Sequence, residues 1–298
     1  MTKPERKLVV ADCLGFCRGV EHALALFQSA AAASPEPLYV LYELVHNRAV
    51  SEQMRRQGAV FVSSLDQVPA GSRLLIGAHG LPLALHEQAR QKGLRVIDAT
   101  CQLVKKLHAL AASVPPEATL LLLGKAGHPE AIGILGHSGS PNTCLIQSLE
   151  ELEALPPLRQ PVLLTQTTVN HNEVQAVREA FCRRFPDGRC PVSICAASRQ
   201  RQEAVEKLAR RTELVLVIGS SHSSNARRLC ECALQAGTPA VLIENADSIP
   251  EAVQAVRRLG LSAGASTPEY LIAHTVERLL AMGFTLQKDS LPPDNHGQ

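Results

Sequence analysis

The sequence contains no tryptophan, and aromatic residues make up only 3% of its 298 residues. Aliphatic side chains must therefore fill the core. An apolar content of 45% is enough for a folded chain, and the length predicts about two domains. Long hydrophobic runs are absent too: no stretch approaches ~18 apolar residues, so we expect no membrane-spanning helix and no membrane partner. The apolar run from Leu8 to Ala11 is shorter than the core of a signal peptide, which predicts a cytoplasmic protein.

Neither sign of charge dominates the sequence. Its 30 lysines and arginines and its 28 acidic residues are mixed along the chain, and the net charge is +2. Because there is no basic stripe, we expect no nucleic-acid partner. The chain has nine cysteines, and the cytoplasm keeps thiols reduced, so we expect core residues, metal ligands or nucleophiles rather than disulfides.

Short apolar runs alternate with alanine-rich helical patterns, which predicts an α/β fold of parallel units. We expect strands at 8–12, 38–42, 59–62, 73–78, 94–99, 119–123, 144–147, 161–165, 191–195, 214–219, 239–243 and 260–263. We expect helices at 18–33, 48–57, 83–92, 102–112, 129–136, 170–184, 198–210, 224–236, 248–258 and 268–282. Glycines that suit helix ends are Gly58, Gly93, Gly237 and Gly283. Ser266 and Glu269 have the spacing of a capping box, with Pro268 in the first helical turn.

Three of the expected strands finish on a cysteine that leads into a helix or loop, namely Cys17, Cys101 and Cys195. The intervals between them are 84 and 94 residues, and 103 more residues follow the last one. This spacing predicts three similar lobes, each a small, mostly parallel sheet flanked by helices, in a pseudo-threefold trefoil around a central site. We expect the lobes at 18–101, 102–195 and 196–284, the last completed by the N-terminal strand 8–17, and a disordered tail at 285–298.

The setting of these three cysteines favours a metal-binding role. A lone free cysteine is more often a small buried hydrophobe, but three at matching strand ends, beside helix N-termini that favour thiolates, indicate ligands. Three thiolates suit a zinc site with a fourth ligand or an iron–sulfur cluster. Cysteines this widely separated, without local Cys-x-x-Cys pairs, argue against ordinary structural zinc. We expect packing roles for Cys144, Cys182, Cys230 and Cys232.

Polar loops follow several other expected strands. They contain His46 in VHN, His79 in AHG, His128 in GHPE, the run SSHSSN from Ser220 to Asn225, and Ser266 in GAS. In parallel α/β units, ligands bind at the carboxyl ends of strands and at helix N-termini. A single histidine beside a glycine is more often a turn residue, but this set of histidines, serines and asparagine predicts a phosphate cradle. No P-loop sequence occurs, so a nucleotide site of that kind is not indicated.

Glu130 follows His128 at an expected helix start. It is either a first-turn acid favoured by the helix dipole or, if it is partly buried, a group that holds and passes a proton. The run from Thr165 to Thr168 ends a strand and offers hydroxyls for such a relay.

Together, these segments resemble the 4-hydroxy-3-methylbut-2-enyl diphosphate reductase family. The matching pieces are GFCRGV, VHN, AHG, DATC, GHPE, TQTT, RQEAV, GSSHSSN and AGAS, in the family's order over nearly the full chain. The resemblance implies a two-electron, two-proton reductive dehydroxylation of an allylic diphosphate. The products would be isopentenyl and dimethylallyl diphosphates, in the last step of the methylerythritol phosphate isoprenoid pathway. Ferredoxin or flavodoxin would supply the electrons.

The resemblance also implies residue roles. Cys17, Cys101 and Cys195 would hold a [4Fe–4S] cluster with one open iron, which would bind the substrate's hydroxyl oxygen. Glu130 would be the proton source, with Thr167 as its hydroxyl partner. His128 would help to bind the substrate and supply charge. The residues implied to grip the diphosphate are His46, His79, Ser223, Ser224, Asn225 and Ser266.

Two alternatives stay open. Arg18, Gln102 and Ile132 depart from the residues that the family commonly has, which is compatible with a divergent, non-catalytic iron–sulfur sensor or ligand-binding paralogue. A zinc-dependent hydrolase would use the same cysteines, with Glu130 as its base. The hydrolase would be colourless, and the sensor would bind a cluster without turning over the diphosphate.

Overall fold

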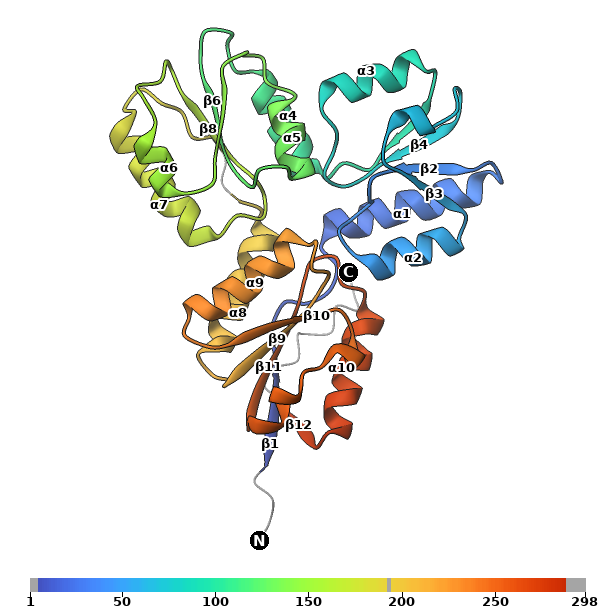
Figure 1. Ribbon diagram of the computed structural model, residues 1–298, viewed down its shortest axis with the longest axis vertical. Coiled ribbons are helices and arrows are strands. Elements are labelled where there is room, and N and C mark those ends of the chain that lie inside the picture. The colour runs from blue at the N-terminus through green and yellow to red at the C-terminus, as the bar shows by residue number, and fades with distance from the viewer. Residues whose placement is uncertain (1–4, 192–193, 288–298) are drawn as a thin grey trace, which may run out of the picture. The chain divides into compact units, whose positions relative to one another are not determined.

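The protein is described by a computed structural model that covers residues 5–191 and 194–287. Over these residues it forms three small parallel sheets, each flanked by its own helices (Figure 1). The strands are β1 (Arg6–Val10), β2 (Leu38–Leu41), β3 (Ala59–Val62), β4 (Arg73–Ile76), β5 (Arg95–Asp98), β6 (Leu120–Leu123), β7 (Thr143–Ile146), β8 (Val162–Thr165), β9 (Leu214–Ile218), β10 (Ala240–Ile243), β11 (Arg258–Ala263) and β12 (Phe284–Leu286).

Helices connect most of these strands. The α-helices are α1 (Arg18–Ala33), α2 (Arg48–Arg56), α3 (Leu83–Gln91), α4 (Gln102–Ala112), α5 (Pro129–Leu135), α6 (Leu149–Ala154), α7 (His171–Arg184), α8 (Ala196–Ala209), α9 (Ser224–Gln235) and α10 (Glu269–Ala281). Short 3-10 helices are η1 (Leu65–Gln67), η2 (Ala246–Ser248) and η3 (Glu251–Ala255). Along the described part of the chain, no helix has both the length and the hydropathy that crossing a bilayer requires.

The strand orders are β3-β2-β4-β5, β7-β6-β8 and β10-β9-β11-β1-β12. The ladders are parallel, and β1 pairs with β11 on one side and β12 on the other. The expected α/β class with small parallel sheets is therefore confirmed, as is the joining of the N-terminal strand to the C-terminal sheet. The trefoil arrangement and the three lobe boundaries stay predictions.

The apolar runs of the sequence follow from burial on both faces of a sheet. All five residues of β9 are buried. Leu214, Leu216 and Ile218 pack into one core cluster, whereas Val215 and Val217 pack into another on the opposite face. Successive strand side chains point to opposite faces, and helices cover both faces of parallel sheets, so such strands are continuously apolar.

The chain divides into two compact units. The first unit contains the chain up to Cys17, the segment His46–Ala49 and the chain from Ala196 onward. The second unit contains Arg18–Val45 and Val50–Cys195. The second unit holds the two smaller sheets, and the first holds the five-stranded sheet.

Most expected elements are confirmed to within about two residues at each end. The helix expected at 248–258 is wrong, because Asn245 caps the short η2 and Pro250 precedes the separate η3. Neither α6 nor β12 was expected. The tail expected from residue 285 begins too early, since Thr285 and Leu286 belong to β12, and 288–298 lie outside the described residues. The strand expected at 191–195 falls partly on 192–193, which are also outside the description.

The glycines expected at helix ends are confirmed, whereas the capping box expected at the start of the last helix is wrong. Gly58, Gly93, Gly237 and Gly283 all have positive φ values. The capping box at Ser266, however, does not form: α10 has Pro268 at its N-cap without a side-chain hydrogen bond. The Ser266 hydroxyl instead donates to the carbonyl of His46 at 3.2 Å, which is a contact within the first unit.

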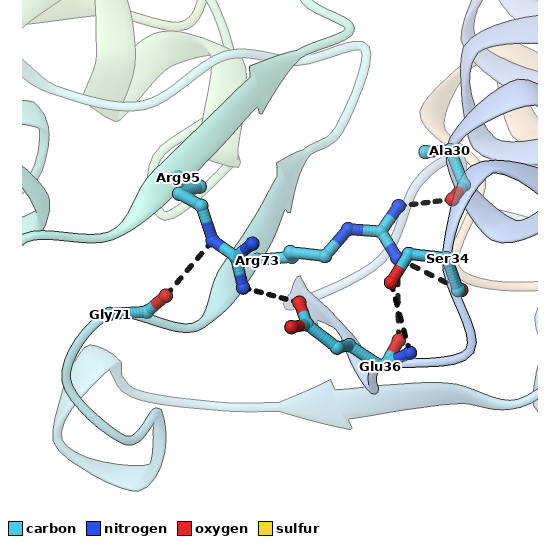
Figure 2. Close-up of polar contacts among 6 residues, drawn as sticks. All are labelled: Ala30, Ser34, Glu36, Gly71, Arg73 and Arg95. Atoms are coloured by element: carbon cyan, nitrogen blue, oxygen red, sulfur yellow. Dashed lines mark hydrogen bonds and ion pairs between the residues drawn. The ribbon is translucent and has the colours of Figure 1, made fainter.

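Arg73 joins the start of β4 to the end of α1 inside the second unit. Arg73 is 7% exposed, and its guanidinium donates to the carbonyls of Ala30, Ser34 and Glu36 (Figure 2). The carbonyls of Ala30 and Ser34 lie at the C-terminal end of α1, where the helix dipole is negative, and Glu36 follows in the connection to β2. The buried charge of Arg73 is therefore compensated by main-chain oxygen atoms. Beside it, Arg95 forms an exposed ion pair with Glu36.

We expect Arg73→Met to lower the free energy of unfolding by about 2–4 kcal/mol, because it removes charged hydrogen bonds and takes away the donor that Arg73 gives to the buried carbonyl of Ala30. Arg95→Met removes an exposed pair and should cost about 0–1 kcal/mol. Urea unfolding followed by circular dichroism compares the two variants. Equal losses of unfolding free energy in the two variants would show that the hydrogen bonds of Arg73 do not stabilise the contact between β4 and α1.

Candidate functional site

Each of the three cysteines singled out in the sequence directly precedes a helix. The helices α1, α4 and α8 begin at Arg18, Gln102 and Ala196, the residues that follow Cys17, Cys101 and Cys195. A thiol at this position faces free N–H groups and the positive end of the helix dipole, which stabilise a thiolate. Each cysteine therefore stands directly before a helix. The expected strand ends at these cysteines are not all confirmed, since β1 ends at Val10, seven residues before Cys17, and the described part of 191–195 is not strand. That the three sulfur atoms hold one cluster stays a prediction.

Four other thiols are poor ligands. Burial raises the pKa of Cys144 and Cys190, and it raises the pKa of Cys230 and Cys232 to about 12. These thiols stay protonated at neutral pH, whereas metals bind thiolates. Cys144, Cys230 and Cys232 contact core clusters, which confirms their packing role. The packing role expected for Cys182 is wrong, since it is exposed on α7.

In the second unit, a buried carboxylate is hydrogen-bonded to a threonine. Glu130, in the first turn of α5, is 1% exposed. Its carboxylate accepts hydrogen bonds from the backbone N–H of Thr167 at 2.6 Å and from the Thr167 hydroxyl at 2.8 Å. Thr167 follows β8 of the same sheet. Glu130 is thus a fixed interior group rather than a solvated first-turn acid.

His128 lies beside this pair as the N-cap of α5. Its Nδ1 accepts a hydrogen bond from the backbone N–H of Glu130 at 3.1 Å. In the neutral imidazole, the proton therefore sits on Nε2, which makes that nitrogen a donor. The ring of His79 meets the ring of His128 edge to face, with centroids 5.4 Å apart. Two of the expected substrate-binding histidines are thus neighbours.

Backbone contacts attach two of the cysteines to these loops. The N–H of Cys101 donates to the carbonyl of Ala78 at 3.0 Å, next to His79. The N–H of Cys195 donates to the carbonyl of Thr167 at 3.4 Å. The second unit therefore links Cys101, His79, His128, Glu130, Thr167 and Cys195 through successive contacts.

Asp98 fixes the turn before Cys101. Its carboxylate accepts from the N–H and the hydroxyl of Thr100 and forms an ion pair with Lys105 at 2.8 Å. Burial raises the pKa of Asp98, but the hydrogen bonds from Lys105 and Thr100 outweigh it and leave the pKa below its usual value. The charged carboxylate therefore holds the DATC turn in shape.

The first unit brings together another group of expected residues. The N–H of Cys17 donates to the carbonyl of Ala265 at 3.1 Å, and the neighbouring Ser266 reaches His46. Ser223 caps α9 by accepting from the N–H of Ala226 at 3.3 Å. Cys17, His46 and Ser266 thus share one edge of this unit.

Two side chains at the start of α9 have buried polar atoms without a partner among the described residues: the Ser224 hydroxyl and the Asn225 amide nitrogen. Leaving such a group unpaired costs about 1–3 kcal/mol. Donors at a helix N-terminus that await an acceptor suit a phosphate group. The loop therefore has the chemistry that a diphosphate needs.

Sequence reasoning missed Arg201. This residue is 3% exposed, and its guanidinium donates to the carbonyls of Ala197 at 3.1 Å and Gly15 at 2.9 Å. A signal was present, since Arg201 shares the helical face of Ala204, Val205 and Leu208, which are buried. An arginine on a buried helical face has to be explained by a partner.

His108 of α4 is buried between the AHG loop and α5. Its ring stacks on His137 with centroids 3.9 Å apart. A methyl group added at Gly80 or Gly133 would lie 2.6 or 3.0 Å from this ring. Burial and the nearby His137 and His86 lower the pKa of His108 to about 4.

Acid should therefore destabilise this region. The unfolded His108, with its pKa near 6.5, binds a proton more readily than the folded residue, so stability falls between about pH 6.5 and 4. His108→Leu should weaken this dependence by about 1–2 kcal/mol between pH 7 and pH 5. Urea unfolding of both proteins at each pH measures the difference. An unchanged pH dependence would mean that His108 is not held neutral by the fold.

Fold and site together define an α/β protein whose polar and thiol side chains gather at strand ends and helix starts. A model of the LytB protein family matches residues 8–280, and the chain belongs to this family.

Known proteins resemble the chain over most of its length. A protein named 4-hydroxy-3-methylbut-2-enyl diphosphate reductase from Actinobacillus pleuropneumoniae serotype 5b is 39% identical over 286 residues, 93% of this chain and 91% of that protein. A protein of the same name from Bordetella pertussis is 40% identical over 290 residues, 95% of this chain and 89% of that protein. The solved structure of the E-1-hydroxy-2-methyl-but-2-enyl-4-diphosphate reductase from Plasmodium falciparum is similar, with a TM-score of 0.91 and 30% identity. That match covers 95% of this chain and 92% of the Plasmodium chain.

Proposed function

We propose that this chain reduces 4-hydroxy-3-methylbut-2-enyl diphosphate to isopentenyl and dimethylallyl diphosphates, the last step of the methylerythritol phosphate pathway. The allylic C–O bond breaks, the hydroxyl group leaves as water after taking one proton, and two electrons with a second proton complete the allyl product. Family membership and the names of the relatives support the substrate.

The observation that carries the proposal is the Glu130–Thr167 pair. Hydroxide is a poor leaving group, so the reaction needs a proton held at a fixed place away from bulk water. Glu130 is 1% exposed and is oriented by two hydrogen bonds from Thr167. Its carboxyl group therefore holds and delivers the proton, with the Thr167 hydroxyl as its relay.

His128 acts next to this acid. Because its Nδ1 accepts from the N–H of Glu130, its Nε2–H is the group that binds substrate oxygen and stabilises negative charge. His79 packs against the His128 ring and contributes a second imidazole to substrate binding.

The residues proposed to bind the diphosphate are His46, His79, Ser223, Ser224, Asn225 and Ser266. The unpartnered Ser224 hydroxyl and Asn225 amide supply hydrogen bonds at the N-terminus of α9. Charge-assisted bonds of this kind contribute about 1.5–3 kcal/mol each and hold the substrate by its inert end.

The proposed cofactor is a [4Fe–4S] cluster on Cys17, Cys101 and Cys195, with one iron open. When bound, such a cluster supplies the electrons and a Lewis acid for the hydroxyl oxygen. The residues fit this group, since each thiol stands at a helix N-terminus. Ferredoxin or flavodoxin is the proposed electron donor, and the cytoplasm the proposed location.

Cluster assembly tests the ligand set. We expect the protein purified without oxygen to be brown, with four irons and four sulfides per chain for the [4Fe–4S] cluster proposed above. Cys101→Ser should lose most of this iron and sulfide, because a hydroxyl replaces the thiolate. Cys182→Ser is the control and should keep both, since Cys182 is exposed on α7. A full cluster in the Cys101 variant would show that Cys101 is not a ligand. A wild-type protein that contains zinc but no iron or sulfide would favour the hydrolase.

Turnover tests the proton source. Glu130→Gln should keep the cluster and substrate binding but lower kcat by about 10²–10³-fold, because the amide cannot donate an acidic proton. The amide still matches Thr167, since its oxygen accepts from the N–H and its nitrogen donates to the hydroxyl. The exposed Glu117→Gln serves as control. Turnover of the diphosphate is measured with reduced methyl viologen as the electron source.

An unchanged kcat in the Glu130 variant would move the proton source elsewhere. Absence of turnover in the wild-type protein with an intact cluster would instead favour the non-catalytic iron–sulfur paralogue.

A further inference from the structure

Arg201 carries a buried positive charge that no acidic group among the described residues neutralises. It is 3% exposed, and its partners are the carbonyls of Ala197 and Gly15. The guanidinium Nε is buried and has no partner, and no carboxylate within residues 5–191 and 194–287 forms an ion pair with it. Burying an uncompensated charge costs several kcal/mol. The arrangement therefore lacks an anion.

The place of this charge makes the imbalance larger. Arg201 folds back to the carbonyl of Ala197 in the first turn of α8, which is the positive end of that helix. The positively charged guanidinium and the positive end of the helix dipole therefore lie next to each other. Both features attract the same kind of ligand, an anion bound at the start of α8.

Arg73 shows how the same fold compensates a buried arginine when no ligand is required. Its guanidinium contacts carbonyls at the negative end of α1, and none of its nitrogen atoms is buried without a partner. Arg201 is similarly buried but sits at the opposite pole of its helix. Filling space is therefore not a sufficient reason for an arginine at position 201.

The segments that Arg201 joins indicate which anion is missing. Gly15 lies two residues before Cys17, and Ala197 lies two residues after Cys195, the residue before α8. Gly15 has a φ of +71°, which turns its carbonyl in a conformation that other residues rarely adopt. Within the first unit, Arg201 thus joins the main chain just before Cys17 to the first turn of α8.

We propose that Arg201 is a positioning residue whose charge compensates the thiolate-ligated iron–sulfur group on Cys17 and Cys195 and raises its reduction potential. The inference rests on the proposed function, since it requires that group. An added electron makes an anionic group more negative, so a nearby fixed cation stabilises the reduced form. The two hydrogen bonds of Arg201 to carbonyls keep its guanidinium in place at the N-terminus of α8.

The test is a redox titration of the oxygen-free holoprotein with dithionite and mediators, followed by the cluster's visible absorbance. Arg201→Gln removes the charge but keeps an amide donor for one carbonyl, and Arg201→Met keeps only the alkyl stem. Both should hold the wild-type iron and sulfide content and show a more negative midpoint potential. We expect reduction to become about tenfold less favourable, which is 59 mV for one electron. Arg201→Lys keeps the charge and should stay close to the wild-type potential.

Arg73→Met is the matched control, because it removes a similarly buried arginine whose guanidinium donates to carbonyls at and just after the negative end of a helix. It should lower stability without moving the potential. A wild-type potential in the two neutral Arg201 variants would overturn the proposal. So would neutral variants that do not fold, which would make Arg201 a structural residue.

Two further outcomes separate this inference from the function on which it rests. An unchanged potential with a raised KM for the diphosphate would make the substrate, rather than the cluster, the anion that Arg201 faces. A wild-type holoprotein without iron and sulfide would refute the proposed function itself and this inference with it.

Discussion

Parallel strand pairing is the constraint on which the candidate site depends. All strands of a parallel sheet run in one direction, so their carboxyl ends, and the loops that follow, emerge at the same edge. The bonds of Cys101 to Ala78 and of Thr167 to Glu130 each join two such loops. The apolar strands contribute no chemistry themselves. They fix the start of each polar loop, and the helix that follows adds its N-terminal dipole.

Burial gives the polar side chains of these loops their properties. Glu130 is held away from water by Thr167, and His108 is kept neutral between two glycine-containing segments. Arg201 forms no ion pair with a carboxylate of the described residues, and its buried Nε has no hydrogen-bond partner among them. Each of these groups costs folding free energy, which the apolar faces of the helices and sheets offset. Such groups persist in a protein when a ligand or a reaction uses them.

Local patterns in the sequence predicted most of the fold. Apolar runs and helix periodicity located most strands and helices, and glycine located several helix ends. One error has a local cause, since Asn245 and Pro250 divide one expected helix into two short ones. The missed strand β12 has a tertiary cause, because it pairs with β1 from the other end of the chain. The candidate cysteines and polar loops were recognisable because their residue types recur at strand ends.

The sequence by itself determined which side chains stand at the strand ends and which helices follow them, because both depend on residues a few positions apart. Tertiary structure decided what those side chains contact. Ser266 bonds to His46 instead of capping its own helix, Glu130 meets Thr167, and Arg201 reaches Gly15. These partners lie 220, 37 and 186 residues apart. A contact across such a separation depends on how the strands pair and how helices pack on them, and local propensity does not encode it.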